Sequence, residues 1–350
     1  MSSIQSYTAV PTSIIKDIYF ESMNYVDHQE SSIQVSAPLA TYETTLFHSV
    51  SRGAKCTRHT KNLTTTILHD LMTRSVLFET SNALQARELT TYVQSSIVEF
   101  QQEVVSKQSK HAILDQIQTH QVGNLLYVRF AFRTGNASGH NMTTFASDAL
   151  ATYIVQKHPR VKYLSVSGNF CVDKKVSAVN SIWGRGKSVI AEMWISREIC
   201  TNILRTTPEK MVELNIKKNF IGSISSGSIM SANAHYANML LAFYIATGQD
   251  GANIVEGSQG VTHCEVIDDQ LYFSVSIPNI IVGSIGHGKN LEGPKTQLEN
   301  MGCIGPYGAQ RCAHIAAALV LCGELSLMAA LTNQFELTNS HSMIERVSNT

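Results

Sequence analysis

The stretch LLYVRFAFR, residues 125–133, decides the fold of this 350-residue chain. Its apolar residues, from Leu126 to Phe132, alternate with Tyr127, Arg129 and Arg133. A period of two places successive side chains on opposite faces, so the stretch is predicted to be a β-strand with one buried face. The neighbouring elements can be assigned outward from it.

Upstream of this strand, the pattern predicts a strand, a helix and a second strand. Residues 74–80 form a short β-type run, and residues 112–117 form a weaker one. Between them, over 88–107, apolar residues recur at spacings of four, three and four from Val93 to Val104. That spacing is typical of one face of a helix.

Downstream of the strand, the segment GNASGHN (135–141) leads into a helix that is predicted to reach about residue 157. Residues 161–166 form the last strand of this unit. The complete order is β-α-β-β-α-β, the split or ferredoxin-like pattern.

After residue 167 the chain changes character, with glycine-rich turns between long helical stretches at 231–247 and 309–332. We therefore expect an α/β (α+β) protein with a discontinuous large domain, residues 1–79 and 167–350. The small ferredoxin-like domain, residues 80–166, is expected to be inserted into it.

The composition agrees with a folded chain of two lobes. Hydrophobic residues make up 43% and charged residues 15%, the opposite of a disordered chain. Lys plus Arg and Asp plus Glu are equal at 27 each, so no overall field favours nucleic acid or an anionic membrane.

Targeting and metal signals are weak. The N-terminus lacks the pattern of a signal peptide, and the richest apolar run, Ile315 to Leu321, is short for a membrane span. The seven cysteines form no C-x-x-C pair and the thirteen histidines no H-E-x-x-H motif. We expect a cytoplasmic protein with reduced thiols and no metal, acting without membrane or nucleic acid.

Four polar clusters interrupt apolar segments: Ala40–Glu43, Ser167–Lys175, Ala246–Asp250 and Ser340-His341. Together they supply carboxylates, lysines and a histidine. Hydride addition to a thioester carbonyl develops an oxyanion, which an ammonium stabilises, and the departing thiolate needs a proton. Taken singly, each cluster is equally typical of a solvated turn, a helix cap or a surface histidine.

Two glycine-containing segments are candidate cofactor loops. The segment 135–141 lies between a strand and a helix N-terminus, where free N–H groups suit phosphate or amide groups. The segment 285–290 follows a strand-like stretch, 271–282, and could let backbone approach a cofactor. Neither is a G-x-G-x-x-G motif, and simple turns, with Asn141 as a helix N-cap, explain both equally well.

The order and wording of these clusters resemble one family, class I 3-hydroxy-3-methylglutaryl-CoA reductase, from about residue 35 to the end. The matching blocks are ATYE (40–43), RGAK (52–55), TGNASGHNM (134–142), SGNFCVDKK (167–175), GRGKS (184–188), NAHYAN (233–238), GQD (248–250), GHGKN (286–290) and GELSLMAA (323–330).

The resemblance implies reduction of hydroxymethylglutaryl-CoA to mevalonate with two reduced nicotinamides, through a hemithioacetal and mevaldehyde. It also implies a homodimer with shared active sites. By position, Glu43 matches the proton donor of the aldehyde step, and Lys174 matches the lysine at the carbonyl oxygen. Asp250 matches the aspartate that tunes that lysine, and His341 the histidine that protonates the CoA thiolate.

The resemblance further implies binding roles. The positions that hold the hydroxymethylglutaryl group and line its pocket are Ser167, Asp173, Lys175, Lys218 and Asn238. The CoA-contacting positions are Arg52 and Arg205. The cofactor loops contain Asn136, Ser138, Gly139, Asn141 and Gly286. The family favours NADPH, with NADH left open, and Lys110 and Arg346 are the expected partners of its phosphates.

The chain departs from the family at several positions. Asn136 stands where Asp is common, and the second loop reads GHGKN instead of GGGTN. Glu79 is matched to a substrate-binding arginine of the animal enzymes, and the tail before His341 is one residue longer than usual. The alternatives to an active reductase are a non-catalytic CoA- or dinucleotide-binding homologue and a reductase of another acyl-CoA.

Overall fold

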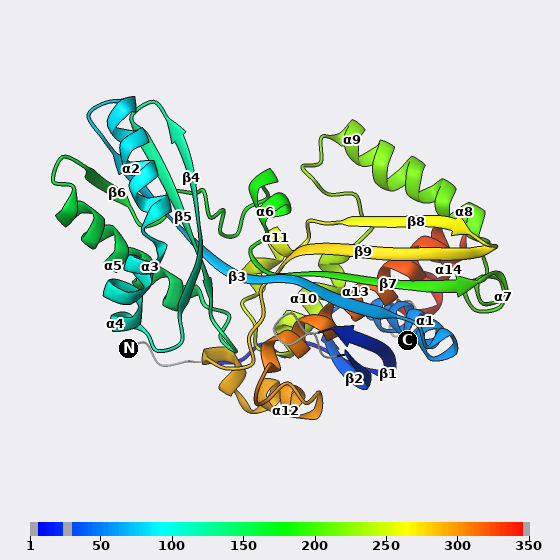
Figure 1. Cartoon of the computed structure of the whole chain (residues 1–350). Helices are drawn as coiled ribbons and strands as arrows, with labels where there is room; N and C mark the ends of the chain where they lie inside the picture. Colours follow the sequence, from blue (N-terminus) through cyan, green and yellow to red (C-terminus); the bar gives the residue numbers. More distant parts are fainter. Residues whose placement is uncertain (1–5, 24–29, 346–350) are drawn as a thin grey trace.

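The computed structural model describes residues 6–23 and 30–345, and its two sheets share one long strand, β3 (Figure 1). The larger sheet has the strand order β2-β1-β3-β7-β9-β8. Neighbours are antiparallel, except β1 and β3, which run parallel. Its strands are β1 (Thr12–Met23), β2 (Glu30–Ala40), β3 (Thr64–Glu79), β7 (Gly186–Ser196), β8 (Val261–Ile267) and β9 (Gln270–Ile280).

The second sheet has the order β4-β5-β3-β6, and all its pairs are antiparallel. The strand predicted over 125–133 is confirmed at both ends as β5 (Leu125–Arg133). The weaker strand is longer than predicted, β4 (Ile113–Val122), and the last one is shorter, β6 (Lys162–Ser165). The predicted order of element types is therefore present, and the mixed α/β class is confirmed.

Strand β3 extends ten residues further upstream than the strand predicted over 74–80. It pairs with β7 as far as Leu71 and with β5 from Met72 onward. The first half was missed because Asp70 interrupts the apolar pattern. Asp70 is buried in the structure, where its carboxylate lies 3.0 Å from the ammonium of Lys187 on β7. A buried carboxylate needs such a partner, which no hydrophobic pattern reveals.

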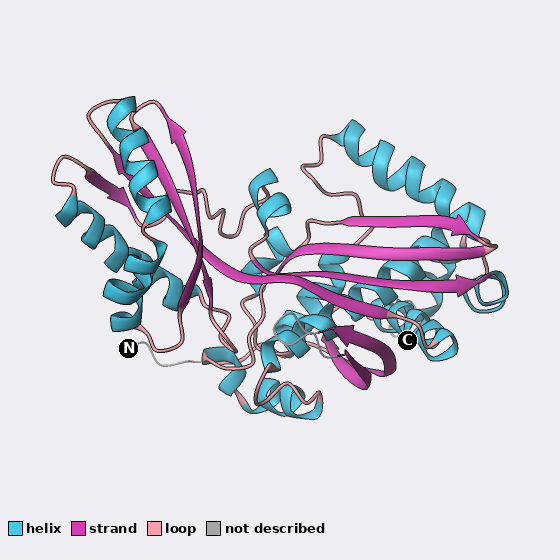
Figure 2. Ribbon diagram, in the orientation of Figure 1, coloured by secondary structure: helices cyan, strands magenta, loops and turns pink. Residues whose placement is uncertain are grey.

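Helices cover one face of the second sheet (Figure 2) and enclose a core separate from that of the larger sheet. The predicted helix 88–107 begins earlier, because Asn82 accepts a hydrogen bond from the Gln85 amide at 2.9 Å and caps it. The other covering helix begins at His140, after Gly139 with φ +92°, so the alternative that made Asn141 the N-cap is wrong. These helical segments are α2 (Ala83–Ser95), α3 (Ile97–Phe100), η1 (Gln101–Val105), α4 (Ser106–Gln108) and α5 (His140–Lys157).

The core of the larger sheet contains helices α1 (Thr45–Thr60), α10 (Tyr236–Ala246) and α13 (Gly308–Leu331). Helix α1 crosses α13 so closely that a Cβ on Gly53 would lie 2.0 Å from the carbonyl oxygen of Cys322. Helix α13 is long and apolar enough to cross a membrane, but 89% of its apolar window is buried inside the protein. It is the central core helix.

The remaining helices lie around this core. The helix predicted over 231–247 begins only at Tyr236, since Ala232 instead bridges Val261 of β8. The other helical segments are α6 (Ala178–Trp183), α7 (Arg197–Ile199), η2 (Cys200–Leu204), α8 (Pro208–Leu214), η3 (Asn215–Gly222), α9 (Ser223–Ser226), η4 (Gly251–Asn253), α11 (Ile254–Gly257), η5 (His287–Asn290), α12 (Glu292–Asn300) and α14 (Glu336–Glu345).

One buried histidine of α13 makes the stability depend on pH. Burial, and to a lesser extent the charge of Arg311, lowers the pKa of His314 from 6.5 to about 4. The unfolded chain therefore binds this proton more readily, and stability falls as the pH drops from about 6.5 toward 4. Between pH 7 and pH 4.5, the free energy of unfolding should therefore fall by roughly 2–3 kcal/mol less in His314→Leu than in the wild type.

Urea unfolding at the two pH values measures this difference. His111→Leu, on an exposed loop, is the control and should follow the wild type. If the stability of His314→Leu fell with pH as much as that of the wild type, His314 would not contribute to the pH dependence.

Candidate active site

The first polar cluster is built on the loop 166–177 between β6 and α6, which we call the Lys174 loop. The ammonium of Lys174 lies 2.8 Å from Oδ2 of Asp250, which follows α10. Partial burial would raise the pKa of Asp250, but hydrogen bonds from Lys174 and from the Ala252 amide lower it on balance. The predicted partnership of Lys174 and Asp250 is therefore present within one chain as an ionised pair.

Three further predicted residues lie on the same loop. The ammonium of Lys175 donates to the backbone carbonyl of Asp173 at 3.1 Å. The guanidinium of Arg74 lies 3.8 Å from Asp173 and 3.5 Å from the hydroxyl of Ser167. Ser167 and Asp173 thus contact a guanidinium that can hold a carboxylate, and Lys175 lies on the same loop.

Arg74 is the residue that the sequence reasoning missed. The comparison by position places the family's substrate-binding arginine at Glu79, five positions further along the same strand. Glu79 instead pairs with Lys162 at 3.1 Å on the exposed part of the second sheet. The available signal was an arginine between two small polar residues, Thr73 and Ser75, within the otherwise apolar stretch 71–78; both neighbours are buried.

The backbone of the Lys174 loop is unusual. Asn169, Val172 and Lys174 have φ values of +59°, +46° and +56°. Positive φ is uncommon for residues with a side chain and is a clear outlier for β-branched valine. Such conformations cost of order 1–3 kcal/mol each and persist only where surrounding contacts enforce them, as at functional sites.

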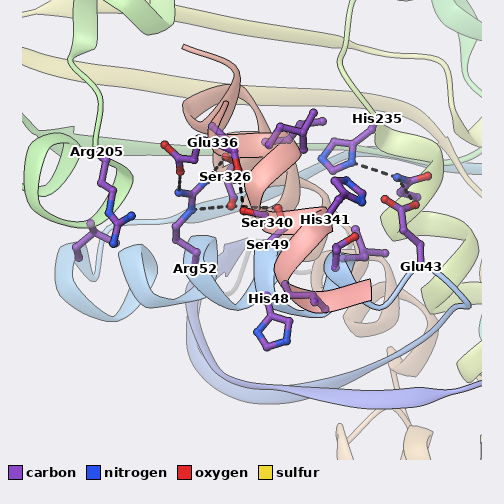
Figure 3. Close-up of a pocket in the computed structure, with 18 residues that line it drawn as sticks. Glu43, His48, Ser49, Arg52, Arg205, His235, Ser326, Glu336, Ser340 and His341 are labelled. Atoms are coloured by element: carbon purple, nitrogen blue, oxygen red, sulfur yellow. Dashed lines mark hydrogen bonds and ion pairs between the residues drawn. The ribbon is translucent and has the colours of Figure 1, made fainter. Parts of the chain in front are cut away.

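The second polar cluster lines a cavity of about 450 Å³ between α1, α10, α13 and α14 (Figure 3). Glu43, directly before α1, accepts a hydrogen bond from the side-chain amide of Asn238 on α10 at 3.2 Å. His341 of α14 also lines the cavity, and Figure 3 shows it near Glu43. The structure therefore brings together two predicted proton donors and a predicted pocket residue.

The far end of this cavity is cationic. The guanidinium of Arg52 pairs with Glu336 at 2.5 Å and donates to the hydroxyl of Ser326 at 2.9 Å. Arg205 lines the same end, in the left-handed conformation that terminates η2. Two arginines suit the phosphates of a CoA-like ligand, as the resemblance implies.

The two clusters are distinct in a single chain. Within the part of the chain that the structure describes, no residue that lines the cavity belongs to the Lys174 loop or is Asp250. Lys218 joins neither set of contacts, since its ammonium donates to the neighbouring Asn219 at 3.2 Å. The predicted catalytic residues are thus divided between two places.

The two glycine-containing segments pack against each other. The carbonyl of Asn136 accepts from the Ser284 amide at 2.9 Å, and Ala137 bridges Ile285. Gly283 has no room for a side chain, because a Cβ would lie 2.5 Å from the Ser138 amide nitrogen. The two predicted cofactor loops therefore form one surface.

Asn136 fixes this surface to helix α13. Its side-chain amide donates to the Gly305 carbonyl at 2.7 Å, and its side-chain oxygen accepts from the Ala309 amide at 3.1 Å. A carboxylate could not make the donated bond. These two contacts explain why this chain has Asn at position 136, where the family commonly has Asp.

This surface also has room and free donors for a ligand. Gly286 has φ +107° and nothing within 4 Å of the place where a Cβ would be. Helix α5, of 18 residues, begins directly after Gly139 on the first of the two loops, and the first amides of a helix have no partner within it. Asn141 is the second residue of that helix. These features fit a nicotinamide cofactor.

The cofactor loops lie beside the Lys174 cluster. Burial, and to a lesser extent the charge of Arg185, lowers the pKa of His140 to about 4, although the charges of Asp173 and Asp250 act in the opposite direction. His140 is therefore neutral near pH 7 and within electrostatic range of the Lys174–Asp250 pair. No role had been predicted for it.

The two predicted phosphate partners have different outcomes. Lys110 is exposed and precedes Ile113, which pairs with Arg133 at the start of the cofactor loop. Arg346 lies outside the described residues. Among the residues that the structure describes, no group of His, Cys, Asp and Glu could hold a metal ion.

Known proteins match this chain over nearly its full length. The family model described as hydroxymethylglutaryl-coenzyme A reductase matches residues 4–346. The 3-hydroxy-3-methylglutaryl-coenzyme A reductase of Pyrococcus horikoshii is 44% identical over 315 residues, 88% of this chain and 76% of that protein. The same enzyme of Methanocaldococcus jannaschii is 42% identical, over 84% of this chain and 73% of that protein.

A plant relative and a solved structure extend the comparison. Reductase 1 of Oryza sativa subsp. indica is 39% identical over 89% of this chain and 59% of that protein. A class II 3-hydroxy-3-methylglutaryl-CoA reductase from Streptococcus pneumoniae, solved with NADPH, superposes with a TM-score of 0.73. It covers 95% of this chain and 88% of that one, and at 14% identity it shows the shared fold alone.

Proposed function

This chain belongs to the hydroxymethylglutaryl-coenzyme A reductase family, and from that premise we propose that its two polar clusters are the two halves of one active site. The protein reduces 3-hydroxy-3-methylglutaryl-CoA to mevalonate and free CoA with two equivalents of reduced nicotinamide. The observation that carries the assignment is the Lys174–Asp250 pair at 2.8 Å, next to an open glycine surface.

In both reductions, Lys174 stabilises the oxygen that gains charge. Its ammonium donates to the carbonyl oxygen of the thioester and later to that of the aldehyde. Asp250 accepts a hydrogen bond from this ammonium and directs it. Arg74, with Ser167 and Lys175, holds the carboxylate of the hydroxymethylglutaryl group. The nicotinamide supplies the hydride from the glycine surface.

The cavity supplies the protons. After the first hydride transfer, the hemithioacetal loses its thiolate, which His341 protonates to free CoA. Mevaldehyde then accepts the second hydride, and Glu43, held by Asn238, protonates the oxygen to give the alcohol. Arg52 and Arg205 bind the CoA phosphates. Each thioester consumes two hydrides and two protons.

These steps require a homodimer in which the cavity of one chain faces the Lys174 cluster of its partner. An exposed apolar patch beside the Lys174 loop supports this arrangement. The buried amide of Gln259 ties the patch together, donating at 3.1 Å to Ser177, Ser181 and Ile229. The exposed apolar residues of the patch are Val176, Ile182, Trp183, Ile229 and Met230.

We assign the cofactor to residues 80–166 as a small ferredoxin-like domain inserted in the large domain, residues 1–79 and 167–350. Strands β4, β5 and β6 and most of a separate core lie within residues 80–166, which supports the division. The second half of β3, residues 72–79, completes this sheet from the other side of the boundary. NADPH is the proposed cofactor, with Asn136, Ser138, Gly139, Asn141 and Gly286 at its nicotinamide end. Lys110, at the same end of the sheet, is its proposed phosphate partner.

A spectrophotometric assay tests the activity. Purified protein with hydroxymethylglutaryl-CoA should oxidise two equivalents of NADPH per mevalonate formed. A preference for NADH would change the assigned cofactor but leave the proposed reaction unchanged. Reduction of a different acyl-CoA, or binding of CoA and cofactor without turnover, would favour one of the two alternative functions.

Mixing two inactive variants tests the shared site. Glu43→Gln and Lys174→Ala chains should regain activity when refolded together, because each hybrid dimer has one site with neither substitution. Random assembly would give up to roughly a quarter of the wild-type specific activity. Each variant refolded alone is the control.

Mass measurements must show that hybrids have formed. Hybrids without activity, or a fully active monomer at the assay concentration, would place all four catalytic residues in one chain instead.

A further inference from the structure

The motif Gly184-Arg185-Gly186 has no place in the mechanism given above, although its central side chain is fully buried. Both glycines have positive φ, +70° and +83°. A Cβ on Gly184 would lie 2.2 Å from Nε2 of His69, and one on Gly186 would lie 2.6 Å from the Ile280 carbonyl oxygen. The two glycines thus fix a backbone path that places an arginine inside the protein.

Two carboxylates surround this arginine. Nη1 of Arg185 lies 2.9 Å from Oε1 of Glu256, which is also fully buried. Nη2 lies 3.1 Å from Oδ1 of Asp173 on the Lys174 loop. A buried ion pair contributes little net stability, because desolvation of the charges offsets their attraction. Stability alone therefore does not explain why the pair is present.

Glu256 connects Arg185 to the turn that carries Asp250. Burial raises its pKa, and the charge of Arg185 offsets only part of that shift. The same Oε1 accepts from the side-chain amide of Asn253 at 3.0 Å. Asn253 closes the single turn that Asp250 opens.

The Lys174 loop needs such support because its backbone is strained. Lys174 and Val172 both have positive φ. The buried amide of Asn180 donates to the Val172 carbonyl at 2.8 Å and holds one side of the loop. Arg185 holds the other side through Asp173, and Glu256 in turn holds Arg185.

We propose that Arg185 and Glu256 are positioning residues that hold the Lys174 loop and the Asp250 turn at the spacing required for catalysis. Arg185 fixes the loop through Asp173, and Glu256 joins the loop to the turn through Asn253. Neither side chain touches a reacting atom. This inference rests on the proposed function of Lys174.

The first test is Glu256→Gln, which keeps the shape of the side chain but removes its charge. We expect kcat to fall roughly 10- to 100-fold, because a displacement of about 1 Å at the reacting centre costs that much. KM for the cofactor should change less than about threefold, since neither residue contacts the cofactor loops. KM for the thioester should rise by less than kcat falls, because Arg52 and Arg205 still bind its CoA part.

The control is Asp70→Asn, in a different buried ion pair, which joins β3 to β7. Asp70 lies 3.0 Å from Lys187 and accepts from Gln310 at 2.8 Å, and none of these residues belongs to either cluster. Its loss should lower the melting temperature as much as Glu256→Gln does, with kcat nearly unchanged.

A double variant keeps the test decisive if the single one does not fold. Arg185→Met with Glu256→Leu replaces the pair by apolar side chains, which buried sites commonly tolerate. It should fold with near-normal thermal stability but retain the low kcat. Wild-type kcat in either this variant or Glu256→Gln would overturn the proposal.

Two parallel measurements separate this inference from the proposed function. Wild-type protein without reductase activity would refute the function itself, and Lys174→Ala with normal kcat would refute the role of Lys174. If both behave as expected, while Glu256→Gln resembles Asp70→Asn, only the positioning role is wrong.

Discussion

Replacing Lys174 with alanine is expected to lower kcat roughly 100- to 1000-fold, because the oxyanion then develops without its cation. The thioester should still bind, since Arg52 and Arg205 lie in the other cluster. The loss should therefore appear mainly in kcat, with a smaller change in KM. Steady-state assays with thioester and NADPH measure both.

Folding must be separated from chemistry in this experiment. The Lys174–Asp250 pair is partly exposed, with side-chain exposures of 41% and 44%, so its removal should cost little stability. Lys162→Ala, which breaks an exposed pair with Glu79, is the matched control and should remain active. Near-normal turnover in a folded Lys174→Ala protein would remove Lys174 from the mechanism.

Replacing His341 with glutamine is expected to separate the two reductions. An alkyl thiol has a pKa near ~8.5, so its departure near neutrality benefits from a positioned acid. Imidazole can hold and release that proton in the working range. The aldehyde step expels no thiolate. The variant should therefore lose most thioester reduction, roughly 100-fold or more, and keep reduction of mevaldehyde.

Glu43→Gln is the counterpart and should impair both assays, because the complete reaction passes through the aldehyde. NADPH oxidation is followed with thioester, and separately with mevaldehyde plus CoA. Equal loss of both activities in His341→Gln, or loss of neither, would contradict the assignment of His341 as the acid for the thiolate.

The sequence allowed the second sheet to be predicted because its signals are local. The alternation in 125–133 and the helical spacing from Val93 to Val104 are visible in the chain itself, and both elements are present. The first half of β3 was not visible. This half pairs with β7, which is more than a hundred positions away in the sequence, so no local pattern can predict the pairing.

The sequence blocks that resemble the family identified most of the site residues. They did not show which of these residues lie together in the folded chain. Lys174 and Asp250 are 76 positions apart in the sequence and meet only through the fold. Arg74 was missed because matching by position chose Glu79 on the same strand. Arg185 was quoted only as part of a motif, since full burial of an arginine depends on partners that the sequence does not place.

The sharing of β3 by two sheets has a mechanical consequence. The strand changes partners between Leu71 and Met72, with no glycine or proline along its length to allow a sharp bend. Arg74 is only two residues beyond this exchange point, whereas its partner Asp173 is fixed from below by Arg185. If the second sheet moves as a unit when the cofactor binds, Arg74 moves relative to Asp173. Binding of the cofactor would then change how the carboxylate of the other substrate is held.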